Sequence, residues 1–231
     1  MMKPILHLFA GLLSIAALAA APMTPIQPAD YEAPVKVACI GDSITQGSGA
    51  GPGKSYPSQL QELLGAEWKV GNFGVSGRTL LKKGDHPYWK EKAYQDALKF
   101  EPDVVIIMLG TNDTKPQNWA HEKEFVADYT ELVNSFQGLA SEPRIYVCRP
   151  CPVPDPGNFG INDKNLQEWI KRIDTLADEM SLGVIDMHKA LADRPKLLPD
   201  RVHPNAEGAG EMAKAAFTAL TGKPAPVPAA R

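Results

Sequence analysis

The sequence predicts a three-layer α/β protein, in which a five-stranded parallel sheet lies between two layers of helices. Two observations support this prediction. Short apolar segments alternate five times with segments whose apolar residues recur every three or four positions, which is the pattern of strands followed by helices. Residues 104–109 are consecutively apolar, and such a run is typical of a parallel strand covered on both faces. A chain of 231 residues can bury the core of one such domain.

The expected elements follow from these patterns in chain order. The strands are expected at residues 36–40, 69–73, 104–109, 145–148 and 183–186. The helices between them are expected at residues 56–64, 88–100, 125–140 and 166–180. A last helix follows Asn205, which is a suitable N-cap, and its apolar positions continue to Leu220. Ligands of such sheets bind outside the carboxyl ends of the strands.

Four segments are expected along the chain. Residues 1–21 combine a positive start, an apolar stretch shorter than the ~20 residues of a membrane span, and small residues at two cleavage positions, after Ala19 and Ala21. We therefore expect a signal peptide, a secreted or periplasmic protein and no stable membrane insertion. Residues 22–34 are expected to be an extended lead-in, residues 35–221 the folded domain, and the proline-rich residues 222–231 a flexible tail.

Composition and charge argue against several classes of protein. Hydrophobic residues make up 44% and charged residues 22% of the chain, and the net charge is −3 without a long run of either sign. Nucleic-acid binding needs a concentrated basic face, so we expect none. The five histidines lack the spacing of metal ligands, so we expect neither a catalytic metal nor another cofactor. Composition predicts no particular oligomeric state.

The three cysteines leave two alternatives open. Cys39 lies in an apolar run and is expected to be buried. Cys148 and Cys151 have the spacing of redox motifs, but they close a strand-like run and enter a proline-rich loop, whereas redox motifs open a helix. An oxidising compartment permits a disulfide between them, and two free thiols are the alternative.

The residues with chemical potential follow the first three predicted strands. Ser43 comes directly after the first strand, Gly77 ends the polar loop after the second, and Asn112 follows the third. Asp200 and His203 directly precede the last helix, which is expected to return beside the first strand. Because parallel strands end at the same edge of a sheet, we expect these residues to form one site.

These residue types fit ester hydrolysis by a serine. The reaction needs a nucleophile, a base to take its proton and a carboxylate to orient that base, and Ser43, His203 and Asp200 can supply them. It also needs hydrogen-bond donors for the developing oxyanion. The amides of Ser43 and Gly77 and the side chain of Asn112 are candidates, and a glycine at position 77 is expected to leave its N–H accessible because it has no Cβ.

These blocks resemble the SGNH hydrolases, also called the GDSL esterase/lipase family. The blocks are Gly41-Asp42-Ser43, the glycine block ending at Gly77, residues 110–113, and Asp200-x-x-His203, in the family's order. The resemblance implies a flavodoxin-like α/β/α fold. It also implies Ser43 as nucleophile, His203 as base, Asp200 as orienting acid, and an oxyanion hole from Ser43, Gly77 and Asn112.

Two further stretches, residues 87–90 and 109–119, are similar to exported bacterial members described as carbohydrate or sialate O-acetylesterases. The resemblance implies a serine esterase that removes short acyl groups, above all O-acetyl groups, from a small-molecule or glycan ester through an acyl-enzyme. A lipase, lysophospholipase or thioesterase of the same family is an alternative. A non-catalytic carbohydrate-binding protein is another.

Several nearby residues have competing interpretations. Asp42 and Asp113 are expected to cap turns or helix starts rather than to take part in catalysis. Arg78 is suited to bind an acidic or polar substrate group, or else to be solvated, and Trp119 is suited to stack on a sugar or to cover the core. Residues 150–160 contain four prolines and are expected to form a rigid wall of the pocket.

Overall fold

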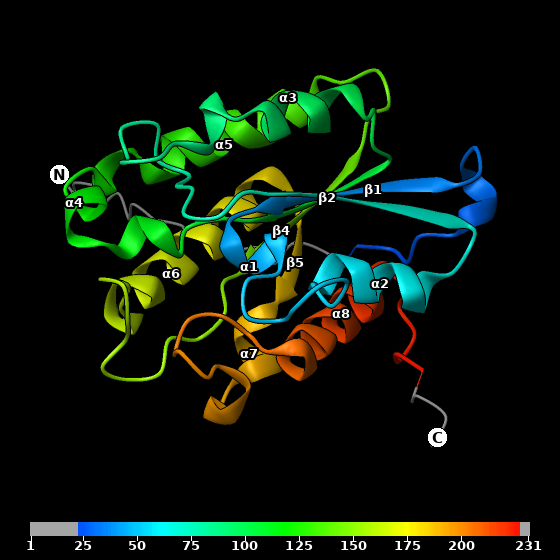
Figure 1. Ribbon diagram of the computed structural model, residues 1–231. Helices are drawn as coiled ribbons and strands as arrows, with labels where there is room; N and C mark the ends of the chain where they lie inside the picture. Colours follow the sequence, from blue (N-terminus) through cyan, green and yellow to red (C-terminus); the bar gives the residue numbers. More distant parts are fainter. Residues whose placement is uncertain (1–22, 227–231) are drawn as a thin grey trace, which may run out of the picture.

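The computed structural model describes residues 23–226, and its centre is a five-stranded parallel sheet with helices on both faces (Figure 1). The strand order is β2-β1-β3-β4-β5. The strands are β1 (Val35–Gly41), β2 (Trp68–Gly74), β3 (Val104–Met108), β4 (Arg144–Arg149) and β5 (Gly183–Asp186). The predicted fold class is therefore confirmed, and each predicted strand is present to within two residues at either end.

The register of the three strands β2, β1 and β3 determines where their loops begin. Gly41, the last residue of β1, pairs with Gly74 on β2 and with Met108 on β3. Because Gly74 and Met108 are the last residues of their own strands, all three strands end at one level. The loops that follow them therefore start side by side at the carboxyl edge of the sheet.

The helices form two layers. The α-helices are α1 (Ser43–Gln46), α2 (Tyr56–Leu64), α3 (Lys92–Lys99), α4 (Pro116–Trp119), α5 (Phe125–Gln137), α6 (Asp163–Met180), α7 (Met187–Leu191) and α8 (Ala206–Thr221). Figure 1 shows α3, α5 and α6 on one side of the sheet and α2, α7 and α8 on the other. The predicted N-cap of α8 is confirmed, because the Asn205 side chain accepts a hydrogen bond from Gly208 N.

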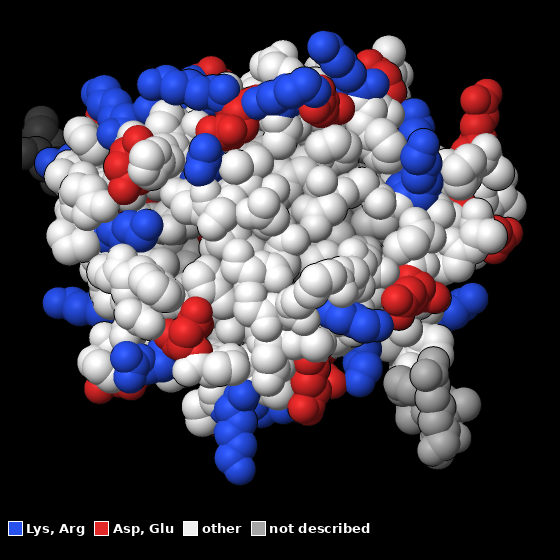
Figure 2. Space-filling view, viewed as in Figure 1, with Lys and Arg blue, Asp and Glu red and all other residues white. Residues whose placement is uncertain are grey.

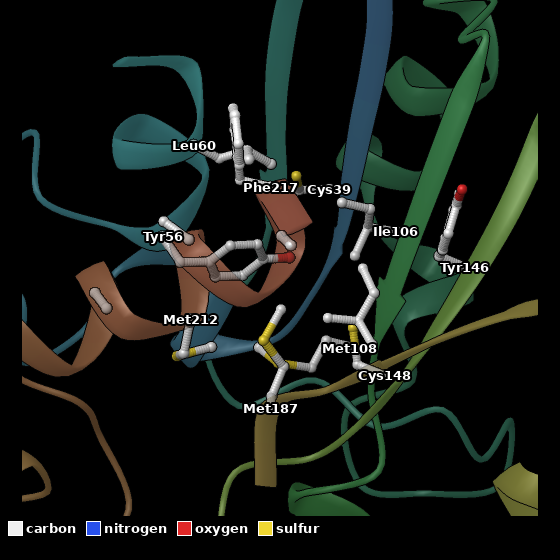
Figure 3. Close-up of a cluster of buried hydrophobic side chains, with 14 of the residues drawn as sticks. Cys39, Tyr56, Leu60, Ile106, Met108, Tyr146, Cys148, Met187, Met212 and Phe217 are labelled. Carbon is white, nitrogen blue, oxygen red and sulfur yellow. The ribbon is translucent and has the colours of Figure 1, made fainter. Parts of the chain in front are cut away.

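Alternating residues of β1 pack into two separate cores. Val35, Val37 and Cys39 belong to the cluster beneath α2 and α8, part of which is drawn in Figure 3. Ala38 and Ile40 belong to the cluster beneath α3, α5 and α6. Both faces of the central strands are thus shielded from water, which explains why β3 is apolar at every position.

The predicted helix at residues 88–100 is wrong in its first turn. Tyr88–Lys90 form a 3-10 helix, Glu91 is extended (φ −83°, ψ 144°), and α3 begins only at Lys92. A tertiary contact accounts for the break. The Tyr88 hydroxyl donates a 2.7 Å hydrogen bond to the carbonyl oxygen of Phe73, which fixes the buried Tyr88 ring beside the end of β2.

The ends of the chain lie partly outside the described residues. The predicted signal peptide, residues 1–21, is among the residues that are not described, as is the predicted tail from residue 227 onward. The predicted lead-in contains a 3-10 helix at Pro28–Asp30 rather than extended chain throughout. Ile26 is only 2% exposed, and its N–H donates to the carbonyl oxygen of Leu220, so this segment packs against the end of α8.

Cys39, Cys148 and Cys151 are buried free thiols, so of the two alternatives the structure shows the one without a disulfide. Burial raises the pKa of Cys39 to about 12 and also raises the pKa of Cys148 and Cys151.

Among residues 23–226 we find no group of histidine, cysteine and acidic side chains able to hold a metal ion. No helix in the same range has the length and apolar character that spanning a bilayer requires. Figure 2 shows acidic and basic side chains interspersed around the edge of one face, whose centre carries no charge.

The cap of α8 provides a test of the fold. Replacing Asn205 with Ala removes the oxygen that accepts from Gly208 N, so we expect the free energy of unfolding to fall by about 1 kcal/mol. Urea denaturation measures this change. Asn205→Ser keeps a capping oxygen and should lose clearly less. Equal stability of wild type and Asn205→Ala would contradict the role of the cap.

Candidate active site

Ser43 is the first residue of α1 and follows β1 after a single intervening residue. That residue, Asp42, is the N-cap, and its Oδ1 accepts a 2.9 Å hydrogen bond from Ile44 N. The cap forces the chain to turn from strand to helix at this point, and it leaves the Ser43 side chain at the carboxyl edge of the sheet. Ser43 is 6% exposed but lines an open cavity.

The structure joins Ser43, His203 and Asp200 in one hydrogen-bonded chain. Ser43 Oγ lies 2.8 Å from His203 Nε2, and His203 Nδ1 lies 2.7 Å from Asp200 Oδ2. These distances are those of direct hydrogen bonds between a hydroxyl, an imidazole and a carboxylate. The three residues predicted to form the catalytic set therefore lie in the arrangement that nucleophilic catalysis by serine requires.

The Asp200 carboxylate is held rigidly by the turn before α8. Its Oδ1 accepts hydrogen bonds from the backbone N–H groups of Val202 (3.0 Å) and His203 (2.7 Å), which leaves Oδ2 for the imidazole. Partial burial acts to raise the pKa of Asp200, but the hydrogen bonds from His203 and Val202 outweigh it and hold this pKa below its usual value. Asp200 is thus ionised at neutral pH and favours the Nδ1–H tautomer of His203.

Two backbone amides beside Ser43 are free to serve an oxyanion. Within residues 23–226, the N–H groups of Ser43 and Gly77 donate to no protein acceptor, and both residues line the cavity. The φ of Gly77 is +81°, a conformation that favours glycine, and a Cβ added there would meet no protein atom within 4 Å. The backbone conformation is thus a further reason for glycine at this position, and the expected access of a substrate to its N–H stays a prediction.

The Asn112 side chain is fixed between two neighbouring loops. Its Nδ2 donates to Asp42 Oδ2 at 3.2 Å and to the carbonyl oxygen of Arg78 at 3.1 Å. Both hydrogens of this amide are therefore engaged, so an oxyanion would have to take the place of one acceptor or share its hydrogen. The structure brings Asn112 together with Ser43 and Gly77 on the cavity wall.

Asp42 caps α1, as the sequence predicts, whereas Asp113 is structural in another way. Asp113 accepts hydrogen bonds from the N–H groups of Leu80 (3.0 Å) and Leu81 (2.8 Å), and so holds the loop after β2 against the loop after β3. Burial raises the pKa of Asp42 to about 6 and that of Asp113 to about 7. Neither carboxylate lines the cavity.

The cavity has a volume of about 270 Å³ and is open to solvent. It is lined by Ser43, Ser76, Gly77, Asn112, Lys115, Phe159, Ile161 and His203. Phe159 and Ile161 come from the proline-containing loop that leaves β4, so this loop does form a wall of the pocket. Ile161 is buried with Val153, Leu166 and Val202, which anchors that wall to the residue next to His203.

The two tentative substrate contacts do not line this cavity. The Arg78 guanidinium donates to Glu91 Oε1 (2.9 Å) and to the carbonyl oxygen of Ser76 (2.6 Å). Trp119 is half-buried in the core beneath α5 and α6, with its ring centroid 4.6 Å from that of Trp169. Of the two interpretations of Trp119, the structure therefore favours core packing.

Phe159 and Lys115 are cavity residues that the sequence did not reveal. Phe159 lies within the expected wall, so the four prolines pointed to its segment but not to its side chain. Lys115 follows the Gly-Thr-Asn-Asp block by two residues, and its aliphatic stem lies near Gly160 of the same wall. An isolated lysine or phenylalanine in a loop carries no pattern that would mark it as part of a site.

Comparison with known proteins finds a family model that matches most of the chain. The model of a family described as GDSL-like lipase/acylhydrolase matches residues 39–210. This range includes every member of the Ser43–His203–Asp200 chain.

Two curated proteins are similar in sequence. An acetylxylan esterase from Xylanibacter ruminicola is 40% identical over 214 residues, which cover 84% of this chain and 44% of that protein. A multidomain esterase from Ruminococcus flavefaciens is 23% identical over 239 residues, which cover 87% of this chain and 30% of that protein. The chain thus spans less than half the length of both relatives.

Solved structures share the fold. A carbohydrate acetylesterase from Sinorhizobium meliloti superposes with a TM-score of 0.64 at 24% identity, covering 79% of this chain and 96% of that one. An acetyl xylan esterase superposes with a TM-score of 0.63 at 25% identity, covering 80% of this chain and all of that one.

The depressed pKa of Asp200 predicts a pH-dependent contribution to stability. A carboxylate whose pKa is lower in the folded state stabilises the fold above its unfolded pKa of about 3.9, and this stabilisation is lost as the pH falls through the folded pKa. We therefore expect Asp200→Asn to lower the free energy of unfolding at pH 7, and the difference from wild type to shrink as the pH is lowered towards 3. Urea unfolding over this range measures it.

Asp193→Asn is the matched control, because it removes the same charge from an exposed carboxylate that accepts no hydrogen bond from residues 23–226. A difference between Asp200→Asn and wild type that stayed constant from pH 7 to pH 3 would show that the Asp200 carboxylate does not act in this way.

Proposed function

The chain belongs to the GDSL-like lipase/acylhydrolase family, and from this premise we propose that it is a serine esterase that removes short acyl groups, above all acetyl groups, from carbohydrates. The observation that supports the chemistry most strongly is the hydrogen-bonded chain from Ser43 through His203 to Asp200. A non-catalytic carbohydrate-binding protein would have no need of such a set, so the structure favours an enzyme over that alternative.

In the proposed first step, Ser43 Oγ bonds to the acyl carbon while its proton passes to His203 Nε2. Asp200 holds the imidazole in place and stabilises the positive charge that it acquires. The carbonyl oxygen becomes an oxyanion, for which the amides of Ser43 and Gly77 are available donors, together with the Asn112 side chain once one of its present acceptors is replaced.

In the proposed second step, the bond between the acyl carbon and the alcohol oxygen breaks. His203 gives its proton to this oxygen, the alcohol leaves, and an acyl-enzyme on Ser43 remains. Water then attacks the acyl carbon as His203 takes one of its protons. Return of that proton to Ser43 Oγ releases the acid and restores the enzyme.

Two observations support a small acyl group on a sugar over a long acyl chain. The relative at 40% identity is named an acetylxylan esterase, and two solved structures with the same fold are named for action on acetylated carbohydrate or xylan. The cavity beside Ser43 has a volume of only about 270 Å³, and its lining includes Ser76, Asn112 and Lys115, which are polar. A long acyl chain would need a larger apolar surface.

We also propose that the protein is exported. The positive start, apolar stretch and small-residue cleavage positions within residues 1–21 support this. N-terminal sequencing of protein recovered from the periplasm or the medium tests it, and a mature chain that begins after Ala19 or Ala21 is the expected result.

Replacement of Ser43 tests the chemistry. We expect Ser43→Ala to lower kcat on p-nitrophenyl acetate by several orders of magnitude, because the nucleophile, base and orienting acid act as a unit. Ser48→Ala, on the next loop, is the control and should retain near wild-type activity. Wild-type turnover by Ser43→Ala, with its fold verified by circular dichroism, would refute the proposed nucleophile.

The acyl group is tested separately. With p-nitrophenyl esters from acetate to decanoate, we expect kcat/KM to be highest for acetate and to fall as the chain lengthens, because the cavity beside Ser43 is small and partly polar. A kcat/KM that rises with chain length would favour a lipase or lysophospholipase instead.

A further inference from the structure

Phe159 is exposed in a backbone conformation that bulky residues seldom adopt. Its φ is +54°, and a non-glycine residue with positive φ is uncommon, above all one with a large side chain. Phe159 is 56% exposed, and it is the most exposed of the three large hydrophobic residues in the range 23–226 that are more than about a third exposed. Neither burial nor backbone preference therefore explains why a phenylalanine occupies this position.

Hydrogen bonds of the preceding residue hold Phe159 in place. Asn158 Oδ1 accepts from Phe159 N at 2.9 Å, and its carbonyl oxygen accepts from Ile161 N at 2.8 Å. Asn158 Nδ2 donates to the carbonyl oxygen of Asp200 at 3.0 Å. One asparagine thus links the loop that carries Phe159 to Asp200, and the backbone of Phe159 has a defined position beside the site.

The ring lies on the side of the cavity where the alcohol would leave. Its centroid is 5.7 Å from that of His203, at an interplanar angle of 53°. In the proposed reaction His203 protonates the leaving alcohol, so a group beside His203 contacts the alcohol part of the ester. In the same proposed reaction, Gly77 and Asn112 are donors to the acyl oxygen instead.

We propose that Phe159 is the platform on which the sugar that carries the acyl group packs. This inference rests on the proposed function and adds to it the residue that selects the alcohol. The carbon-bound hydrogens of a pyranose form an apolar face, and an exposed aromatic ring offers a large, rigid apolar surface to such a face. Phe159 is the only residue with a benzene or indole ring among those that line the cavity within residues 23–226.

The two tryptophans that could also stack on a sugar, Trp119 and Trp89, pack against other side chains of the protein instead. Trp119 packs on Trp169, and Trp89 donates from Nε1 to the carbonyl oxygen of Leu80 while Lys82 Nζ lies 4.3 Å from its ring centroid. Both tryptophans also contact the core beneath α3, α5 and α6. Phe159 therefore takes the part that the sequence suggests for Trp119.

The test keeps the acetyl group constant and changes the alcohol. Acetate release is measured from methyl acetate and from acetylated xylo-oligosaccharides, and the quantity compared is the ratio of kcat/KM on the oligosaccharide to kcat/KM on methyl acetate. We expect Phe159→Ala to lower this ratio about tenfold or more, mainly through KM on the oligosaccharide, because the ring binds the sugar before and during acyl transfer.

Three further variants make the result specific. Phe159→Tyr keeps an aromatic face and should keep the ratio near that of wild type, whereas Phe159→Leu keeps an apolar side chain without that face and should lower it. Val126→Ala shortens another exposed apolar side chain, on α5 and outside the cavity, and should leave the ratio unchanged.

Two outcomes would overturn the platform alone. An unchanged ratio in Phe159→Ala with kcat/KM on both substrates at the wild-type level would show that the ring does not bind the sugar. An unchanged ratio with equal losses of kcat/KM on both substrates would show that the ring positions His203 instead. A wild-type protein that cleaves methyl acetate but no acetylated glycan would overturn the carbohydrate part of the proposed function and the platform with it. A wild-type protein that cleaves neither substrate would overturn the proposed esterase as well.

Discussion

The geometry of the site depends on the hydrogen bonds that the buried carboxylate of Asp42 accepts. Its Oδ1 accepts from Ile44 N and turns the chain from β1 into α1, while its Oδ2 accepts from the Asn112 side chain in the loop after β3. Asn112 in turn donates to the carbonyl oxygen of Arg78 in the loop after β2. The loops of three adjacent strands are therefore joined through the carboxylate of Asp42 and the side-chain amide of Asn112. Burial raises the pKa of Asp42 to about 6, because a buried carboxylate loses its hydration. Without these hydrogen bonds its burial would cost free energy of folding.

The base reaches this junction from a distant part of the chain. His203 lies before α8, and α8 packs beneath the sheet against α2, which brings the end of the domain back to β1 (Figure 1). The approach is close: a Cβ added at Gly49 would lie 2.9 Å from the carbonyl oxygen of Pro204 and 3.0 Å from His203 Cβ. The loop after α1 and the turn before α8 thus touch directly, and this contact places the imidazole within 2.8 Å of Ser43 Oγ.

The loop between β4 and α6 combines rigidity with exposure. Its far end is fixed by Asn162, whose Nδ2 donates to the carbonyl oxygen of Thr114, two residues beyond Asn112. Its middle is fixed by Asn158, which donates to the carbonyl oxygen of Asp200. A segment tied at these points can hold Phe159 exposed at the cavity without local unfolding, and a preorganised wall lowers the entropy that is lost when a ligand binds.

The sequence by itself determined the layered α/β fold, the strand positions and the cap at Asn205, because these depend on local periodicity and capping residues. It also marked the residues that the structure brings together at the candidate site, because they belong to short motifs after strands or before the last helix: Ser43, Gly77, Asn112, Asp200 and His203. Only the tertiary structure decided the break at Glu91, the core position of Trp119, the pairing of Arg78 with Glu91 and the exposure of Phe159. Each of these depends on contacts between residues far apart along the chain, such as the hydrogen bond from Tyr88 to Phe73 or that from Asn158 to Asp200. Such contacts produce no periodicity or fixed spacing in the sequence, so they can be identified only in the folded structure.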